Sequence, residues 1–215
     1  MNLSIIQKKI NDYIITDIKR GGFTLVETIV FISVFTLVML VLVSSIIFFY
    51  RSNAYSVEQS FAVNNARKGV EYLVRDMREM TYSDEGAYPL VSGDANSITL
   101  YSDIDRDKNI EFVRYFLENG TLKKGVTKSS GDPLSYNSNA EVVSVVSLNV
   151  RNLEQSKSIF HYYNDTGGEI FNVGINLTKV AFITVDLIVN INPNRLPNEF
   201  TLHSSAALRN LKTNL

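Results

Sequence analysis

The 215-residue sequence contains no cysteine. This absence excludes disulfide frameworks, thiolate zinc sites and thiol nucleophiles. Any folded domain in the chain must therefore be held together by its hydrophobic core alone.

Histidine and excess charge are also scarce. The two histidines, His161 and His203, lie far from a second histidine or a carboxylate at metal-ligand spacing in the sequence, which argues against a metal site. The formal net charge is -1, so no global basic field points to nucleic acid. There is no G-x-S-x-G elbow and no phosphate-binding glycine loop. We expect a protein that is not an enzyme and that holds no cofactor or metal, with no small-molecule substrate evident.

A long apolar run lies near the start of the chain. From Phe23 to Phe49 the only ionisable side chain is Glu27. A run of about 20 apolar residues is enough to cross a bilayer as a helix. The preceding residues 1–22 carry four basic and two acidic side chains, so the positive-inside rule predicts a cytoplasmic leader and an exported C-terminal part.

The small residues near this run are unusually placed. A secretory signal peptide carries its small-residue cleavage site after its apolar core, whereas Gly21 and Gly22 come before it. Cleavage at this point would remove the basic leader and leave the hydrophobic segment on the mature protein.

The string "GGFTLVE", followed by the apolar run, resembles the class III signal of type IV pilins and type II secretion pseudopilins. The resemblance implies that a prepilin peptidase cuts after Gly22 and methylates the new amine of Phe23. It also implies that Glu27 contacts the N-terminal amine of a neighbouring subunit during assembly. A carboxylate inside an apolar span costs about 2.5 to 3.5 kcal/mol on translocon scales, so a partner is expected. The alternative is that Glu27 lies at the membrane interface and only snorkels.

Beyond Tyr50 the sequence becomes polar but keeps a helical period. We expect one helix from Phe23 to about Met80, with residues 23–49 as the transmembrane part and residues 50–80 as an amphipathic continuation. Gly69 is a candidate for a bend. The apolar stripe of this continuation comprises Val63, Ala66, Val70, Leu73, Val74 and Met77. The charged residues expected to face solvent are Arg67, Lys68, Glu71, Arg75, Asp76, Arg78 and Glu79.

Residues 81–215 show strand-like patterns and are expected to form an exported β-rich domain. The clearest strand lies in 179–191, where one apolar face predicts a sheet with one covered side, the cover being the amphipathic half of the helix. The predicted fold class is α+β, a long N-terminal helix packed on an antiparallel sheet domain. Strands are expected at 97–102, 110–118 and 121–126, with a tight turn at Asn119-Gly120 between the last two. Further strands are expected at 141–150 (where a short helix is the alternative), 158–164, 179–191 and 199–210. Residues 81–96 and 127–140 are expected to be loops.

An acidic segment follows the first of these strands. Asp103, Asp105, Asp107, Asn109 and Glu111 occupy alternate positions, which suggests calcium. An EF-hand loop, however, requires Gly and Glu where this sequence has Lys108 and Arg114. Asp and Asn also favour turns through bonds to nearby backbone. We expect a hairpin loop without a metal, with calcium binding as the alternative.

Two further strings, "VEYLVRDMREM" near the helix end and "LRN" near the C-terminus, are similar to J-type minor pseudopilins and related minor pilins. The resemblance implies a structural subunit that starts in the cytoplasmic (inner) membrane and is assembled into a type IV pilus or a type II secretion pseudopilus. Its partners would be the prepilin peptidase, other pilins or pseudopilins, the assembly platform and, before assembly, membrane lipid. Two alternatives stay open: a major pilin subunit, and an exported binding or enzymatic domain on an uncleaved signal anchor.

Overall fold

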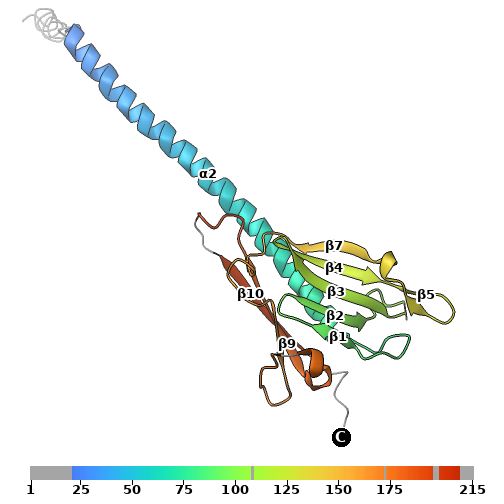
Figure 1. Cartoon of the computed structure of the whole chain (residues 1–215). Helices are drawn as coiled ribbons and strands as arrows, with labels where there is room; N and C mark the ends of the chain where they lie inside the picture. Colours follow the sequence, from blue (N-terminus) through green and yellow to red (C-terminus); the bar gives the residue numbers. More distant parts are fainter. Residues whose placement is uncertain (1–20, 108, 172, 196–198, 209–215) are drawn as a thin grey trace, which may run out of the picture. The chain divides into compact units, whose positions relative to one another are not determined.

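The computed structural model describes residues 21–107, 109–171, 173–195 and 199–208 (Figure 1). Most of the predicted leader, residues 1–20, lies outside the described residues, as do Lys108 and the end of the last predicted strand. The chain divides into two compact units, Met1–Ser52 and Asn53–Leu215.

A single helix, α2 (Leu25–Arg78), accounts for the described N-terminal part of the chain. The prediction of one continuous helix is confirmed, although the helix begins at Leu25 and ends at Arg78. Met80 instead forms an isolated β-bridge with Ser102. The helix is not interrupted at Gly69.

The larger sheet has five antiparallel strands in the order β1-β2-β3-β4-β7, visible to one side of α2 in Figure 1. The three consecutive strands predicted at 97–102, 110–118 and 121–126 are confirmed, and segment 141–150, for which a short helix was the alternative, contains a strand. The first strand falls in the predicted loop 81–96, because four residues between Pro89 and Asp94 are too short to show an alternating pattern. The strands are β1 (Leu90–Gly93), β2 (Ser97–Ser102), β3 (Glu111–Glu118), β4 (Thr121–Thr127) and β7 (Val142–Ser147).

The turn between β3 and β4 has the geometry that its sequence predicts. Asn119 has φ 49° and Gly120 has φ 70°, so both central residues adopt the left-handed conformation. A two-residue turn of this kind matches the right-handed twist of the strands that it joins. It sets the register in which Glu118 pairs with Thr121.

A second antiparallel sheet has the order β10-β9-β8. It confirms the strands predicted within 158–164, 179–191 and 199–210, which are β8 (Phe160–Tyr163), β9 (Phe182–Val189) and β10 (Phe200–Ala207). The predicted loop 127–140 contains a small ribbon made of β5 (Ser129–Ser130) and β6 (Ser135–Tyr136). Three short 3₁₀ turns complete the described elements: η1 (Ser138–Ala140), η2 (Val173–Ile175) and η3 (Leu177–Lys179).

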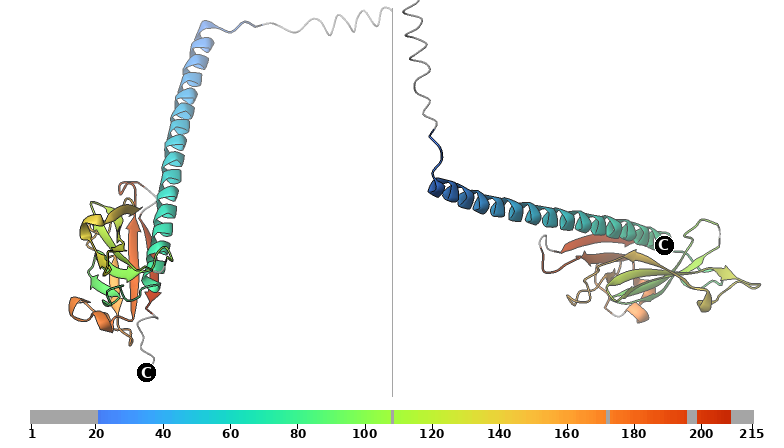
Figure 2. Two further views of the ribbon diagram at one scale, coloured as in Figure 1. Left: turned by 90° about the vertical axis from the view of Figure 1, so that its right-hand side faces the viewer. Right: turned by 90° about the horizontal axis from the view of Figure 1, so that it is seen from above.

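The core of the second unit lies between the two sheets and the part of α2 that belongs to this unit, which runs alongside both sheets in Figure 2. Every predicted stripe residue except Val63 is buried. On β9 the predicted inner face is fully buried. The other face is partly covered too, because Thr184 is only 9% exposed and Ile188 only 2%, so the expectation of a single covered side is wrong at these positions. The core residues on α2 are Ala66, Val70, Leu73, Val74 and Met77, and those on β9 are Ile183, Val185, Leu187 and Val189.

Asp76 corrects the sequence prediction for the charged face of the helix. Its side chain is completely buried, whereas Arg67, Lys68, Glu71, Arg75 and Arg78 are exposed as expected and Glu79 is partly exposed. Oδ2 of Asp76 accepts hydrogen bonds from the Tyr115 hydroxyl and the Lys124 ammonium, both at 2.6 Å. The polar partners come from β3 and β4, so the helical period alone could not reveal them.

Candidate functional site

The predicted cleavage point lies just before α2. Gly21 and Gly22 are exposed and outside any regular element, and a Cβ atom added at either position would meet nothing within 4 Å. Phe23 is 78% exposed. Among the described residues, nothing covers the bond between Gly22 and Phe23.

Glu27 lies in the first turn of α2, where Thr24 caps the helix. The Thr24 hydroxyl oxygen accepts a hydrogen bond of 3.2 Å from the backbone N–H of Glu27. Thr24 thus supplies the N-cap half of a capping box, and a carboxylate at position 27 also favours the positive end of the helix dipole. The sequence carried this signal in "TLVE", and the sequence reasoning did not use it. This bond uses the backbone of Glu27, so the start of the helix is capped within a single chain, whatever the carboxylate contacts elsewhere.

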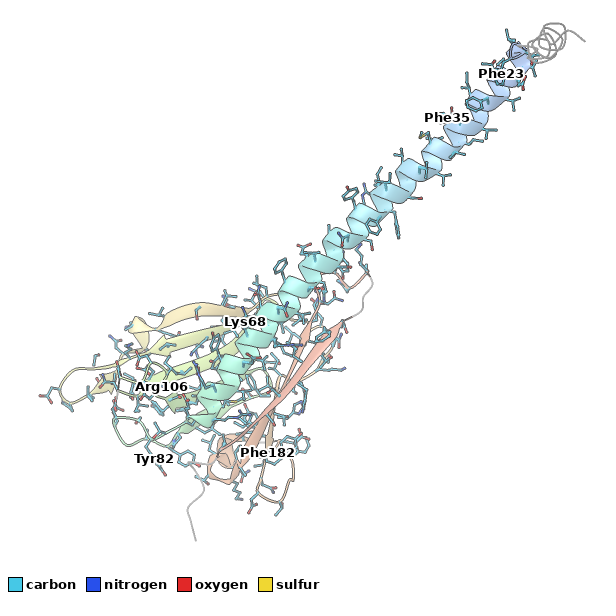
Figure 3. The ribbon with its side chains drawn as sticks, turned by 180° about the vertical axis from the view of Figure 1, so that it is seen from behind. Phe23, Phe35, Lys68, Tyr82, Arg106 and Phe182 are labelled. Carbon is cyan, nitrogen blue, oxygen red and sulfur yellow. The ribbon has the colours of Figure 1, made fainter. Side chains whose placement is uncertain are left out.

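The segment that follows is long and apolar enough to cross a membrane, and its most apolar stretch is entirely unburied. Figure 3 shows Phe23 and Phe35 extending outward from the helix. Several of its hydroxyl groups are satisfied within the helix, as a hydrocarbon environment requires. Ser33 and Thr36 donate to backbone carbonyls one turn earlier, at 2.8 and 2.7 Å. The coarse prediction of a membrane-spanning helix is therefore supported in its local structure.

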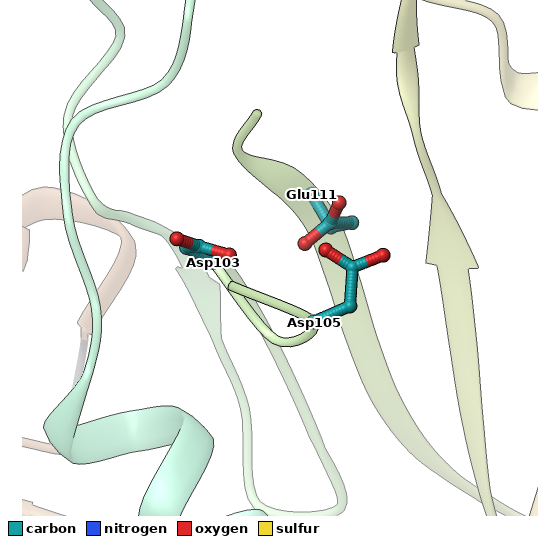
Figure 4. Close-up of side chains that lie close together, drawn as sticks. All are labelled: Asp103, Asp105 and Glu111. Atoms are coloured by element: carbon teal, nitrogen blue, oxygen red, sulfur yellow. The ribbon is translucent and has the colours of Figure 1, made fainter. Parts of the chain in front are cut away.

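The acidic segment forms the connection between β2 and β3. The structure gathers Asp103, Asp105 and Glu111 so that one carboxylate oxygen of each lies within 4.8 Å of the others (Figure 4). Asp107 does not belong to this group. The sequence therefore identified the segment correctly but could not tell which of its four carboxylates converge.

The loop is shaped by bonds from its own side chains, as predicted. Asp103 Oδ1 accepts the N–H of Arg106 at 2.6 Å, and Asp107 Oδ1 accepts the N–H of Asn109 at 2.9 Å. These bonds hold Arg106 in the left-handed conformation, with φ 63°.

Lys108 and Arg114 are the two residues that depart from the EF-hand pattern. Lys108 lies outside the described residues. Arg114 is turned to another partner, with its Nη2 atom 2.8 Å from Glu141 Oε2 and its Nε atom 3.0 Å from Glu141 Oε1. This two-point bond raises the pKa of Arg114. Arg114 is thus committed to Glu141 on the segment before β7.

Glu111, the first residue of β3, is the buried member of the acidic cluster. Its side chain is fully buried, and burial raises the pKa of its carboxyl group. Oε2 accepts the N–H of Ile104 at 3.0 Å, while Oε1 is buried without a hydrogen-bond partner among the described residues. The exposed Lys128 ammonium instead pairs with Asp105 and lies 3.6 Å from Asp107 Oδ2.

Both histidines lie beside carboxylates in the structure, although neither has one at metal-ligand spacing in the sequence. Strand pairing across the smaller sheet brings Asp186 beside both of them, with Oδ1 2.5 Å from His203 Nδ1 and Oδ2 3.8 Å from His161 Nε2. His161 Nδ1 also lies 2.8 Å from Glu169 Oε1. These partners come from other strands and loops, so the spacing along the sequence could not show them.

A groove of about 580 Å³, which no sequence pattern predicted, lies beside α2 and β7. Lys68, Tyr72 and Arg75 contribute from the helix, and Val145 and Leu148 are among the exposed residues on the other side. The lining residues include no histidine that could act as a base for Ser144 or Ser147. The groove presents a mixed polar and apolar surface.

No known protein-family model matches the chain, and no curated protein matches it. Its function must be inferred from the residues and geometry described above.

Proposed function

We propose that this protein is a minor pilin or pseudopilin, a structural subunit that a prepilin peptidase cleaves between Gly22 and Phe23. The subunit would then be drawn from the cytoplasmic membrane into a type IV pilus or a type II secretion pseudopilus. In this proposal residues 1–22 stay in the cytoplasm, the apolar part of α2 lies in the membrane, and the β-rich part is exported. The protein carries out no catalysis itself.

The observation that carries the proposal is the position of the Gly-Gly-Phe string. The uncovered Gly22–Phe23 bond lies two residues before a helix whose first half is apolar and unburied. A peptidase acting there would leave the whole apolar helix on the mature chain, so the helix remains available for assembly.

Glu27 gives the assembly step a physical basis. In lipid its carboxylate is costly, at about 2.5 to 3.5 kcal/mol on translocon scales. In a fibre, apolar helices replace the lipid, and the freed Phe23 amine of a neighbouring subunit supplies the opposite charge. The exchange of lipid for helix contacts is close to neutral for the apolar side chains. The ion pair therefore favours the assembled state.

The test is to express the full chain with and without an active prepilin peptidase and to determine its N-terminus by mass spectrometry. With the peptidase we expect a chain that starts at methylated Phe23, and without it a chain that retains residues 1–22. Gly22→Val should block processing because it changes the residue at the cut, whereas the matched variant Gly21→Val should still be cleaved. Residues 1–22 still attached in the presence of active peptidase would contradict the proposal.

The capping contact favours one alternative, an exported domain on an uncleaved signal anchor. Thr24 accepts the backbone N–H of residue 27, so the start of the helix forms within one chain and needs neither cleavage nor a neighbour. Under this alternative Glu27→Gln would leave the cellular behaviour of the protein unchanged. Under the pilin proposal the same variant is processed but does not enter fibres, which can be measured in sheared fibre preparations. The ratio of this protein to the other subunits in such preparations separates a minor from a major subunit.

A further inference from the structure

The β2–β3 connection presents three carboxylates to one small volume. Asp103 and Asp105 come from the loop and Glu111 from the first position of β3, and one oxygen of each lies within 4.8 Å of the other two. Three carboxylates at this spacing repel one another unless a cation lies among them. The hairpin therefore concentrates negative charge at one end of the larger sheet.

Glu111 supplies an independent sign that something is bound there. Glu111 is fully buried, yet its Oε1 atom has no hydrogen-bond partner among the described residues. Leaving a buried carboxylate oxygen without a partner is costly, so such atoms normally face a donor or a metal. In Figure 4 the Glu111 carboxylate points toward that of Asp105.

Lys128 does not supply the partner that Glu111 Oε1 lacks. Its side chain is 60% exposed and its ammonium pairs with Asp105, at the outer side of the cluster. One exposed ammonium leaves a net negative charge on the three carboxylates, and an exposed ion pair of this kind contributes little to stability. Lys128 can therefore be displaced by a cation that reaches all three carboxylates.

We propose that this loop binds a calcium ion through Asp103, Asp105 and Glu111. All three donors are carboxylate oxygens, which select hard cations such as Ca²⁺ and Mg²⁺ over zinc or copper. Two of the donors lie on an irregular loop, and Ca²⁺ accepts irregular coordination whereas Mg²⁺ demands a near-octahedral shell. The site is a hairpin site rather than an EF-hand, because its buried ligand comes from the start of a strand.

Calcium here would tie the loop to the start of β3. With the ion bound, Glu111 Oε1 gains a partner and the repulsion between the carboxylates is removed. The bound ion should therefore stabilise the larger sheet. This inference concerns the second unit alone and does not depend on whether the chain is a pilin.

The test uses the full chain in detergent micelles, stripped of metal with a chelator and titrated with CaCl₂ or MgCl₂ in a calorimeter. We expect one Ca²⁺ per chain with a Kd on the order of 10⁻⁴ to 10⁻³ M, typical of extracellular calcium modules, together with a higher melting temperature and weaker binding of Mg²⁺. Asp105→Asn and Glu111→Gln should each weaken Ca²⁺ binding by about tenfold or more, because affinity follows the number of charged ligands. The control Asp165→Asn changes an exposed carboxylate outside the cluster and should bind Ca²⁺ like the original protein.

Lys128→Gln tests whether the Lys128 ammonium competes with the ion. Removing the competing ammonium should tighten Ca²⁺ binding several-fold, whereas the cluster variants weaken it. Should Glu111→Gln fail to fold, Asp103→Asn and Asp105→Asn still test the site, since neither residue is buried. The proposal is overturned if the original protein shows neither heat nor a melting shift with Ca²⁺, if the cluster variants bind like the control, or if Lys128→Gln binds more weakly.

Discussion

The hydroxyl of Tyr115 on β3 donates a hydrogen bond of 2.6 Å to the buried carboxylate of Asp76 on α2. Burial, and then the nearby negative charge of Asp76, raise the pKa of Tyr115 far above its ordinary value, so the hydroxyl remains a donor. Lys124 on β4 completes the group, with its ammonium 2.6 Å from the same carboxylate oxygen. A polar connection thus joins the helix to two strands inside an apolar core.

Asp76→Ala should strongly destabilise the protein, because it leaves the Tyr115 hydroxyl unpaired and the mostly buried Lys124 ammonium without its counter-ion. Removing one partner of a buried ion pair costs roughly 3 to 5 kcal/mol of unfolding free energy. The matched control is Glu71→Ala on the exposed face of the same helix, expected to change stability by about 0.5 kcal/mol or less. Chemical denaturation followed by circular dichroism measures both. Equal effects of the two variants would show that the buried group does not stabilise the fold.

Gly69→Ala should destabilise the protein although it replaces glycine by the best helix former. In an exposed helix the change would gain about 1 kcal/mol. Here an added Cβ atom would lie 2.6 Å from Val146 Cγ1 and 2.7 Å from the Val146 carbonyl oxygen. Because the second contact is to backbone, β7 must move away from the helix.

The comparison that isolates this contact is Gly69→Ala combined with Val146→Ala. Shortening the side chain at 146 removes the first clash but leaves the backbone oxygen in place, so we expect incomplete rescue of the melting temperature. The exposed Asn64→Ala serves as the control for helix propensity. A Gly69→Ala protein that is more stable than the original would mean that β7 yields without cost.

From the environment of Tyr136 we expect the protein to lose folding stability at high pH. Its hydroxyl donates to the Ile110 carbonyl oxygen at 2.8 Å and accepts the Asp84 N–H at 3.2 Å. Burial, followed by the negative charge of Asp84, raises the pKa of Tyr136 to about 12. Because the folded state holds this proton more tightly than the unfolded state, the stabilisation is complete below the ordinary tyrosine pKa of 10.0 and is lost as the pH rises toward 12.

This dependence is measured as the difference in unfolding free energy between the original protein and Tyr136→Phe across that pH range. The original protein should be the more stable of the two at neutral pH, and the advantage should shrink between pH 10 and 12. Tyr50, in the other unit, gives the matched change Tyr50→Phe, which should leave the profile of the original protein intact. A constant difference at every pH would rule out Tyr136 as the cause.

Substitutions at Thr24 and Glu27 distinguish the effect of helix capping from the effect of the carboxylate on fibre assembly. Thr24→Ala removes the side chain that accepts the Glu27 N–H but keeps the carboxylate. Losing such a cap costs about 1 kcal/mol of helix stability, an effect confined to the first turn. Glu27→Gln keeps a polar side chain at the same place but removes its charge.

If Glu27 pairs with a neighbouring amine, Glu27→Gln should be absent from fibres while Thr24→Ala still enters them. If the carboxylate has no part in assembly, Glu27→Gln should enter fibres as the original protein does. The readout is the amount of each processed variant in sheared fibres relative to the membrane fraction. Glu58→Gln, an exposed carboxylate further along α2, is the charge-matched control.

Local patterns were enough to predict much of the fold. The helix and the strands at 97–102 and 111–118 have strong periods of apolar residues, and the Asn-Gly turn requires a conformation that few other pairs adopt. The short strands β1, β5 and β6 were missed, because two to four residues carry too little pattern to separate a strand from a loop.

The candidate sites, like the fold, could be predicted from the sequence only in part. The sequence marked Gly22, Phe23 and Glu27 through a contiguous string, and it marked the acidic segment through its composition. It did not show that Glu111 is the buried member of that segment, because burial depends on how β3 packs. Nor did it show the partners of His161 and His203, which come from paired strands distant in the chain.

The sequence by itself determined the features that depend on neighbours along the chain: the apolar helix, its capped start, the alternating strands and the tight turn. Only the tertiary structure decided that Asp76 is buried, that position 69 must be glycine, and which three carboxylates converge. The physical reason is that periodicity reports which side of an element a residue lies on. The partner that it meets there, and hence its burial and charge environment, is set by segments that fold against it from elsewhere in the chain.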